Sequence, residues 1–183
     1  MRRSLTASVV LLALAAASST AFGADGTTAA QQSSGRAAIA YYGGEIARFQ
    51  KQTWHWQRVM GVPLTPRNVR TLAGLTPAAA QLTAEGWRHR SARAYEAAQH
   101  PPHLRQFLCI HRFEGSWTDT GEPYYGGLQM DRGFQQSYGG WLYRTKGTAD
   151  HWSPIEQIWT AEKALKSRGF WPWPNTARYC GLI

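Results

Sequence analysis

The sequence has few of the residues that build metal centres or disulfide-rich folds. Its 183 residues include two cysteines, and 11 acidic residues face 20 lysines and arginines, which gives a net charge of +9. Neither cysteine has another cysteine or a histidine at the spacing of metal ligands, so we expect no metal site. There is one long apolar run and no internal repeat. What remains is a small basic protein, with room for one ordinary domain or for a small domain plus an extension.

The apolar run lies within residues 1–23. Arg2 and Arg3 precede it, and small residues follow it up to Gly23. This order is typical of a signal peptide that is cleaved before Ala24. The alternative is an uncleaved N-terminal anchor, although the run is short for a membrane span. We therefore expect a secreted or wall-associated protein with no membrane contact after cleavage.

Positive charge restricts the partners of an exported chain. Without Arg2 and Arg3, 18 basic and 11 acidic residues leave a charge of +7. Such a charge attracts anionic polymers over long range, and outside the membrane these are cell-wall polymers more readily than nucleic acid. The alternative is that the charge serves only solubility.

Cys109 and Cys180 form one disulfide in the simplest interpretation for an oxidising compartment. The bond would tie the region before Glu114 to the C-terminus, and a loop of this size contributes on the order of 4 kcal/mol to stability. Two free buried thiols are the alternative.

Composition and periodicity divide the mature chain into three segments. Residues 24–36 are small and polar, and they predict a disordered leader. Residues 37–100 combine helical apolar spacing with a start signal at Thr76-Pro77, and they predict a helical hairpin without recognisable chemistry. Residues 101–183 follow a proline break and form a separate C-terminal domain, in which we look for the chemistry. Three tryptophans of the hairpin are interpreted as packing residues, with ligand contact as the alternative: Trp54, Trp56 and Trp87.

Local signals place the elements of the last segment. A helix should lead to Glu114 and end at Gly115, and a strand or hairpin should follow Pro123. Asp131 is expected to cap a short helix that ends at Gly139-Gly140. Ser153, Pro154 and Glu156 predict a capped helix, and the C-terminal residues after Gly169 are expected to be irregular.

Glu114 is the candidate for chemistry. It ends the predicted helix among apolar residues, where both the helix dipole and the neighbours disfavour an anion. A protonated carboxyl in a cleft is what glycosidic cleavage requires. The alternative is an exposed glutamate that pairs with Arg112. Most glycosidases use a second carboxylate, and the nearby candidates are not obvious nucleophiles: Asp119, which can serve a turn, Glu122, and Asp131, which can serve as a cap.

The residues that follow Glu114 suit a saccharide. The Gly126-Gly127 pair allows close approach of a ligand, and Gln129 offers a donor and acceptors to an acetamido group. A simple hairpin with a bulge is the alternative. Three aromatic side chains offer flat faces to sugar rings: Trp117, Tyr124 and Tyr125.

Residues 113–180 resemble the transglycosylase-like domain of resuscitation-promoting factors, a trimmed member of the lysozyme and lytic transglycosylase superfamily. The resemblance rests on a series of short motifs: Glu114-Gly115 with Trp117, YYGGLQMD at 124–131, YGG at 138–140, EQI at 156–158, AEK at 161–163, and Gly169 with Trp173-Pro174. It implies an α+β, mainly α, lysozyme-like fold with a short β-hairpin after the helical hairpin. It says nothing about residues 24–100.

The resemblance also implies the roles of single residues. Glu114 would be the only catalytic acid, no cofactor or metal would be needed, and the family's disulfide agrees with Cys109–Cys180. The groove for peptidoglycan would be lined by seven residues: Trp117, Tyr124, Tyr125, Gln129, Asp131, Arg168 and Trp173.

Three departures from the family accompany this resemblance. Cys109 lies five residues before Glu114, whereas the family's cysteine directly precedes its glutamate, and the loop from Glu114 to Trp117 is shorter by two residues. Arg168 replaces a groove glutamine. It either pairs with substrate carboxylates or stabilises a helix C-terminus.

The expected function is cleavage of the β-1,4 bond between N-acetylmuramic acid and N-acetylglucosamine in glycan strands of peptidoglycan. A non-catalytic wall-binding or signalling module is the main alternative. Nucleic-acid binding has the charge but no motif, and we do not expect it. The sequence does not identify a partner hydrolase.

Overall fold

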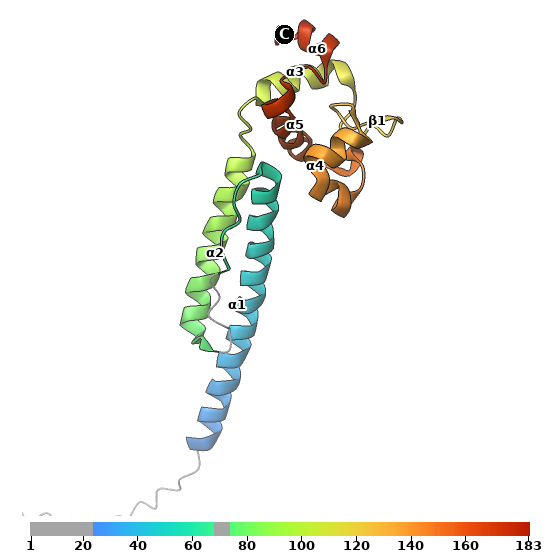
Figure 1. Ribbon diagram of the computed structural model, residues 1–183. Helices are drawn as coiled ribbons and strands as arrows, with labels where there is room; N and C mark the ends of the chain where they lie inside the picture. The colour runs from blue at the N-terminus through green and yellow to red at the C-terminus, as the bar shows by residue number, and fades with distance from the viewer. Residues whose placement is uncertain (1–23, 68–73) are drawn as a thin grey trace, which may run out of the picture.

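The computed structural model describes residues 24–67 and 74–183, which form a long helix pair with a smaller assembly at one end (Figure 1). The predicted signal peptide lies outside the described residues, and no helix within them is long and apolar enough to cross a membrane. The order is α1 (Ala24–Met60), α2 (Pro77–Ala98), α3 (Leu104–Glu114), β1 (Tyr124–Tyr125), β2 (Met130–Asp131), α4 (Arg132–Lys146), the 3₁₀ helix η2 (Ala149–His151), α5 (Pro154–Arg168) and α6 (Pro174–Tyr179). The predicted mainly helical α+β class is confirmed, with one antiparallel two-stranded hairpin.

The helix pair, α1 and α2, runs parallel, which corrects the prediction of a helical hairpin. Gln52 of α1 meets Ser91 of α2, and Trp56 meets Tyr95 further along both helices. After Met60 the chain turns back along α1 as far as it is described before the gap, since Thr65 contacts the side chains of Trp54 and Gln57. The 16 residues between Met60 and Pro77 span up to about 50 Å when extended, which exceeds the length of about 33 Å for α2, so they are long enough to join two parallel helices.

Residues 24–36 belong to α1 and do not form the predicted disordered leader. The segment contains no proline that would break a helix, although its glycine, serine and threonine residues are weak helix formers. The hydroxyls of Ser33 and Ser34 bond back to carbonyls three residues earlier, which satisfies them within the helix.

The C-terminal part, residues 101–183, has its own core and also receives the end of α1. Val59 of α1 is 1% exposed and packs in this core. The indole of Trp159 on α5 donates to the carbonyl of Ala98 at the end of α2. The helix pair is therefore fastened to the C-terminal part by burial as well as by the chain. The largest fully buried apolar side chains of the C-terminal part are Phe107, Ile110, Leu128, Met130, Leu142 and Ile158.

Glu156 of α5 is a buried ionic link between the two parts. Its side chain is 1% exposed, and it accepts from Lys146 Nζ at 2.7 and 2.8 Å and lies 3.0 Å from His55 of α1. Burial by itself raises the pKa of this carboxyl, but hydrogen bonds from His55, Lys146 and the Ser153 backbone outweigh it and lower the pKa to about 2.

Several predicted helix ends are confirmed, one is corrected, and one helix forms where an irregular segment was expected. Asp131 caps α4, and Ser153 with Glu156 forms the expected capping box on α5. The helix α4 does not end at Gly139, where a kink brings the backbone against the ring of Trp152, and it continues to Lys146. The C-terminal residues are not irregular throughout, because α6 forms there.

Candidate functional site

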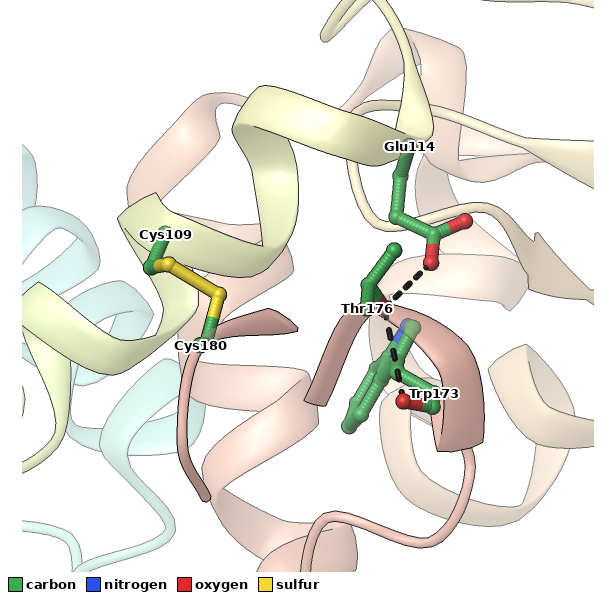
Figure 2. Close-up of a disulfide and its surroundings, with 5 residues drawn as sticks. All are labelled: Cys109, Glu114, Trp173, Thr176 and Cys180. Carbon is green, nitrogen blue, oxygen red and sulfur yellow. Dashed lines mark hydrogen bonds between the residues drawn. A yellow bond between two sulfur atoms is a disulfide. The ribbon is translucent and has the colours of Figure 1, made fainter. Parts of the chain in front are cut away.

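Glu114 is the last residue of α3 and is half-buried. The helix ends because Gly115 takes an extended backbone conformation, with φ 170° and ψ −172°. Oε1 of Glu114 accepts a hydrogen bond of 2.7 Å from the Thr176 hydroxyl on α6 (Figure 2). Among the described residues, no ion pair joins Glu114 to the exposed Arg112. The structure therefore does not support the alternative of a surface ion pair between Glu114 and Arg112.

The predicted disulfide holds α6 in that position. Cys109 and Cys180 are bonded, with Cα atoms 6.1 Å apart. Cys109 precedes Glu114 by five residues, and Cys180 follows Thr176 by four, so the two helices cross the site in opposite directions (Figure 2). The bond and the Thr176–Glu114 contact are thus successive contacts along one helix interface.

Gln129 and Asp119 pack directly against Gly115. A Cβ at this glycine would lie 3.0 Å from Gln129 Nε2 and 3.1 Å from Asp119 Oδ2. The amide of Gln129 donates to Asp119 Oδ2 at 2.8 Å and to the carbonyl of Gly126 at 3.0 Å. Because Gly115 has no side chain, the predicted groove residue Gln129 and its partner Asp119 can both pack against the backbone at the end of α3.

Gln157 of α5 fixes the glycine turn of the β-hairpin. Its side chain is fully buried, its Oε1 accepts from the Gly127 N–H at 2.9 Å, and its Nε2 donates to three carbonyls, including that of Trp117 at 2.8 Å. The Trp117 ring stacks on His111, with centroids 3.9 Å apart. A Cβ at Gly127 would lie within 2.7 Å of both rings, so this turn requires glycine.

The two tyrosines of β1 face different environments. Tyr124 is 49% exposed, whereas Tyr125 is buried and its hydroxyl donates to Glu122 and accepts from Arg132. The pKa of the Arg132 guanidinium is raised above its ordinary value, mainly by its hydrogen bond with Tyr125 and to a smaller extent by the charge of Glu122. Beside them is an open hollow of about 440 Å³, lined by Glu122, Pro123, Asp131, Arg132 and Gly133.

Two other predicted groove residues have supporting positions. Trp173 is only 4% exposed and its indole donates to the Leu128 carbonyl at 2.7 Å, so it presents little surface to a ligand. Arg168 is the last residue of α5 and its guanidinium lies 6.0 Å from the Phe134 ring centroid. It is exposed, and its place in the last turn also suits the helix dipole.

The carboxylates proposed as partners of Glu114 are already engaged. Asp119 accepts from Gln129 and from the Gly121 N–H, and Asp131 Oδ1 caps α4 through the Phe134 N–H at 2.7 Å. Within the described part of the chain, no group of three or more His, Cys, Asp or Glu could hold a metal ion. The arrangement offers one carboxyl with one oriented oxygen, which is suited to proton transfer.

Sequence reasoning missed two residues of this site, Thr176 and Gln157. The signal for Thr176 was the disulfide itself. Because Cys109 pairs with Cys180 on an antiparallel helix, a residue that precedes Cys180 by four lies towards the C-terminal end of α3, where Glu114 is. Gln157 occurs in the EQI motif, but only burial shows that its amide serves four backbone groups.

Comparison with known proteins gives a partial similarity to a resuscitation-promoting factor. No protein-family model matches the chain. Resuscitation-promoting factor RpfE of Mycobacterium tuberculosis is 40% identical over 65 residues, which are 35% of this chain and 35% of that protein. The match thus spans about a third of each protein and supports a relation to resuscitation-promoting factors over that length alone.

Proposed function

We propose that the protein is a secreted peptidoglycan-cleaving enzyme of the lytic transglycosylase or lysozyme type, with Glu114 as its only catalytic acid. The observation that carries the proposal is the setting of this carboxyl. It is half-buried, Thr176 holds one of its oxygens, and Gln129 packs against the neighbouring Gly115. The similarity to a resuscitation-promoting factor supports the same assignment.

The chemistry needs one carboxyl in two roles. Protonated Glu114 donates its proton to the glycosidic oxygen between N-acetylmuramic acid and N-acetylglucosamine, and the bond from C1 to that oxygen breaks. The substrate's acetamido oxygen supports the cationic C1. The Glu114 carboxylate then removes the proton of the muramyl 6-hydroxyl, whose oxygen bonds to C1 and forms the 1,6-anhydro product. The carboxyl is protonated again at the end.

The engaged carboxylates favour this route over hydrolysis. A hydrolase of the usual kind has a second carboxylate as nucleophile or base. Here Asp119 serves a turn, Glu122 pairs with Arg132, and Asp131 caps a helix. The Thr176 hydroxyl bonds to Oε1 of Glu114 and leaves Oε2 for the glycosidic oxygen.

Mass spectrometry of the products tests the proposal. Purified mature protein is incubated with insoluble peptidoglycan, with Glu114→Gln and the exposed Glu96→Gln as a matched control. Anhydro-muropeptides from the wild type and the control, reduced by about 10²–10⁴-fold with Glu114→Gln, are expected. Hydrated ends would instead indicate a lysozyme-type hydrolase. Binding to the wall without products from any variant would reject catalysis in favour of a wall-binding module.

A further inference from the structure

The parallel packing of α1 and α2 creates a groove in a region to which the sequence assigns no role. Residues 48–56 of α1 lie beside residues 88–95 of α2, and between them is an open hollow of about 750 Å³. Its lining residues recur at three- and four-residue steps on each helix, so they share one face of the pair. These two segments belong to the half of the pair that is nearer to the C-terminal part (Figure 1).

The residues that line this groove are basic or neutral. They include Arg48, Lys51 and Arg88 and no carboxylate. Arg48 is engaged, because it pairs with Glu45 at 2.7 Å and lies over the Phe49 ring. Lys51 and Arg88 are exposed, and their side chains make no hydrogen bond or ion pair with any residue that the structure describes. Two cations on opposite helices are thus available to an anionic ligand.

Aromatic surface lies further along the same groove, towards the C-terminal ends of both helices. Tyr95 is 50% exposed and meets Trp56 edge to face, with ring centroids 5.4 Å apart. Such a surface can pack against the apolar face of a sugar ring. The edge-to-face arrangement leaves no parallel platform of the kind on which successive nucleic-acid bases stack.

We propose that this groove binds a carboxylate-bearing glycan strand, with a sugar ring on Tyr95 and Trp56 and carboxylates at Lys51 and Arg88. The inference rests on the proposed function for the class of polymer, but it concerns a second site outside the Glu114 region. The helix pair would then hold the glycan strand while the C-terminal part acts on it.

Binding is measured in the Glu114→Gln background, so that no cleavage disturbs it. The probes are soluble peptidoglycan glycan strands with stem peptides, neutral chitin oligosaccharides of similar length, and a short single-stranded DNA. The test variant is Lys51→Glu/Arg88→Glu. The control is Arg93→Glu/Arg105→Glu, which makes the same charge change at exposed positions outside the groove. A further variant, Tyr95→Ala, removes the exposed ring.

We expect the reversal of Lys51 and Arg88 to weaken glycan binding about tenfold or more and to flatten its salt dependence. The control pair should stay within about twofold, and Tyr95→Ala should weaken binding without changing the salt dependence. Circular dichroism of each variant verifies folding. Equal loss in test and control pairs, equal affinity for chitin, or tighter binding of DNA would each overturn the proposal. Failure of the product assay alone would leave this binding intact, which separates the two proposals.

Discussion

The helix pair and the C-terminal part use their charged residues differently. Residues 37–100 contain eight lysines and arginines and three acidic residues, whereas residues 101–183 contain nine and seven. In the C-terminal part, Glu156 and Glu162 are buried and paired, and Asp119 and Asp131 order turns and helix ends. In the groove of the helix pair, Lys51 and Arg88 have no such partner among residues 24–67 and 74–183. Charge is structural in one region and available for binding in the other.

The two regions also differ in how their elements pack and how their backbone groups are hydrogen-bonded. Each long helix of the pair buries one face against the other helix, and its backbone hydrogen bonds form within the helix itself. The C-terminal part consists of short elements, so single side chains must satisfy backbone groups between them, as Gln157 does. Single changes should therefore have larger effects in the C-terminal part.

The largest expected effect follows from removal of the disulfide. Cys109→Ala/Cys180→Ala should lower the free energy of unfolding of the C-terminal part by on the order of 4 kcal/mol, because the bond closes a long loop. Activity should fall as α6 loses its hold on Glu114. Hydrogen exchange should show faster opening in α3 and α6 and little change in α2. Equal acceleration in α2 would mean that both parts unfold as one unit.

The next effect concerns the ionic link at Glu156. Its carboxyl has a pKa of about 2 in the folded state and 4.5 otherwise, so its stabilisation is complete above about pH 4.5 and is lost as the pH falls towards 2. The contribution at neutral pH is on the order of 3 kcal/mol. Glu156→Gln should remove it and flatten the acid limb of stability, as followed by urea unfolding between pH 2 and 7.

A matched control for that link exists within the helix pair. Glu96 and His100 form an exposed pair whose side chains are 73% and 71% accessible, and exposed pairs contribute little. Glu96→Gln should leave stability and its pH dependence almost unchanged. Equal losses of stability for Glu96→Gln and Glu156→Gln would contradict the view that a buried ion pair stabilises the fold more than an exposed one.

Local signals predicted most of the elements. The caps at Thr76, Asp131 and Ser153 were found because each is a contact within four residues, which the sequence displays directly. The direction of α2 relative to α1 was missed, because it depends on contacts between distant residues, such as those of Thr65 and Ser91 with α1. The helix at residues 24–36 was missed because polar composition suggested disorder.

The candidate site was predicted as a set of residue types, and its arrangement was not. Cys109 and Cys180 were paired correctly because the chain offers no other cysteine. The burial of Trp173 and the engagement of Asp119 with Gln129 depend on contacts between distant segments. The roles of the seven groove residues stay predictions until ligand binding is measured.

A smaller effect is expected from Thr176. Thr176→Val keeps the shape but removes the hydroxyl that holds Oε1 of Glu114. We expect kcat to fall about tenfold, the equivalent of one lost hydrogen bond to a charged group, with KM little changed. Thr176→Ser should restore most of the rate. A fall in thermal stability that accounts for the lost activity, or no recovery with serine, would contradict a positioning role.

The smallest effect compares the same interaction in both regions. Thr76 caps α2 through the Ala79 N–H at 3.2 Å, and Asp131 caps α4 through the Phe134 N–H at 2.7 Å. Either residue changed to alanine should cost about 1 kcal/mol in its own helix, with the larger cost at the shorter, charge-assisted bond of Asp131. Asp131→Asn keeps an acceptor and should restore stability. If Asp131 also binds sugar hydroxyls through its charge, this asparagine variant will unfold like the wild type yet release fewer muropeptides, while Thr76→Ala releases as many as the wild type. Normal release by Asp131→Asn would assign Asp131 to the helix cap alone.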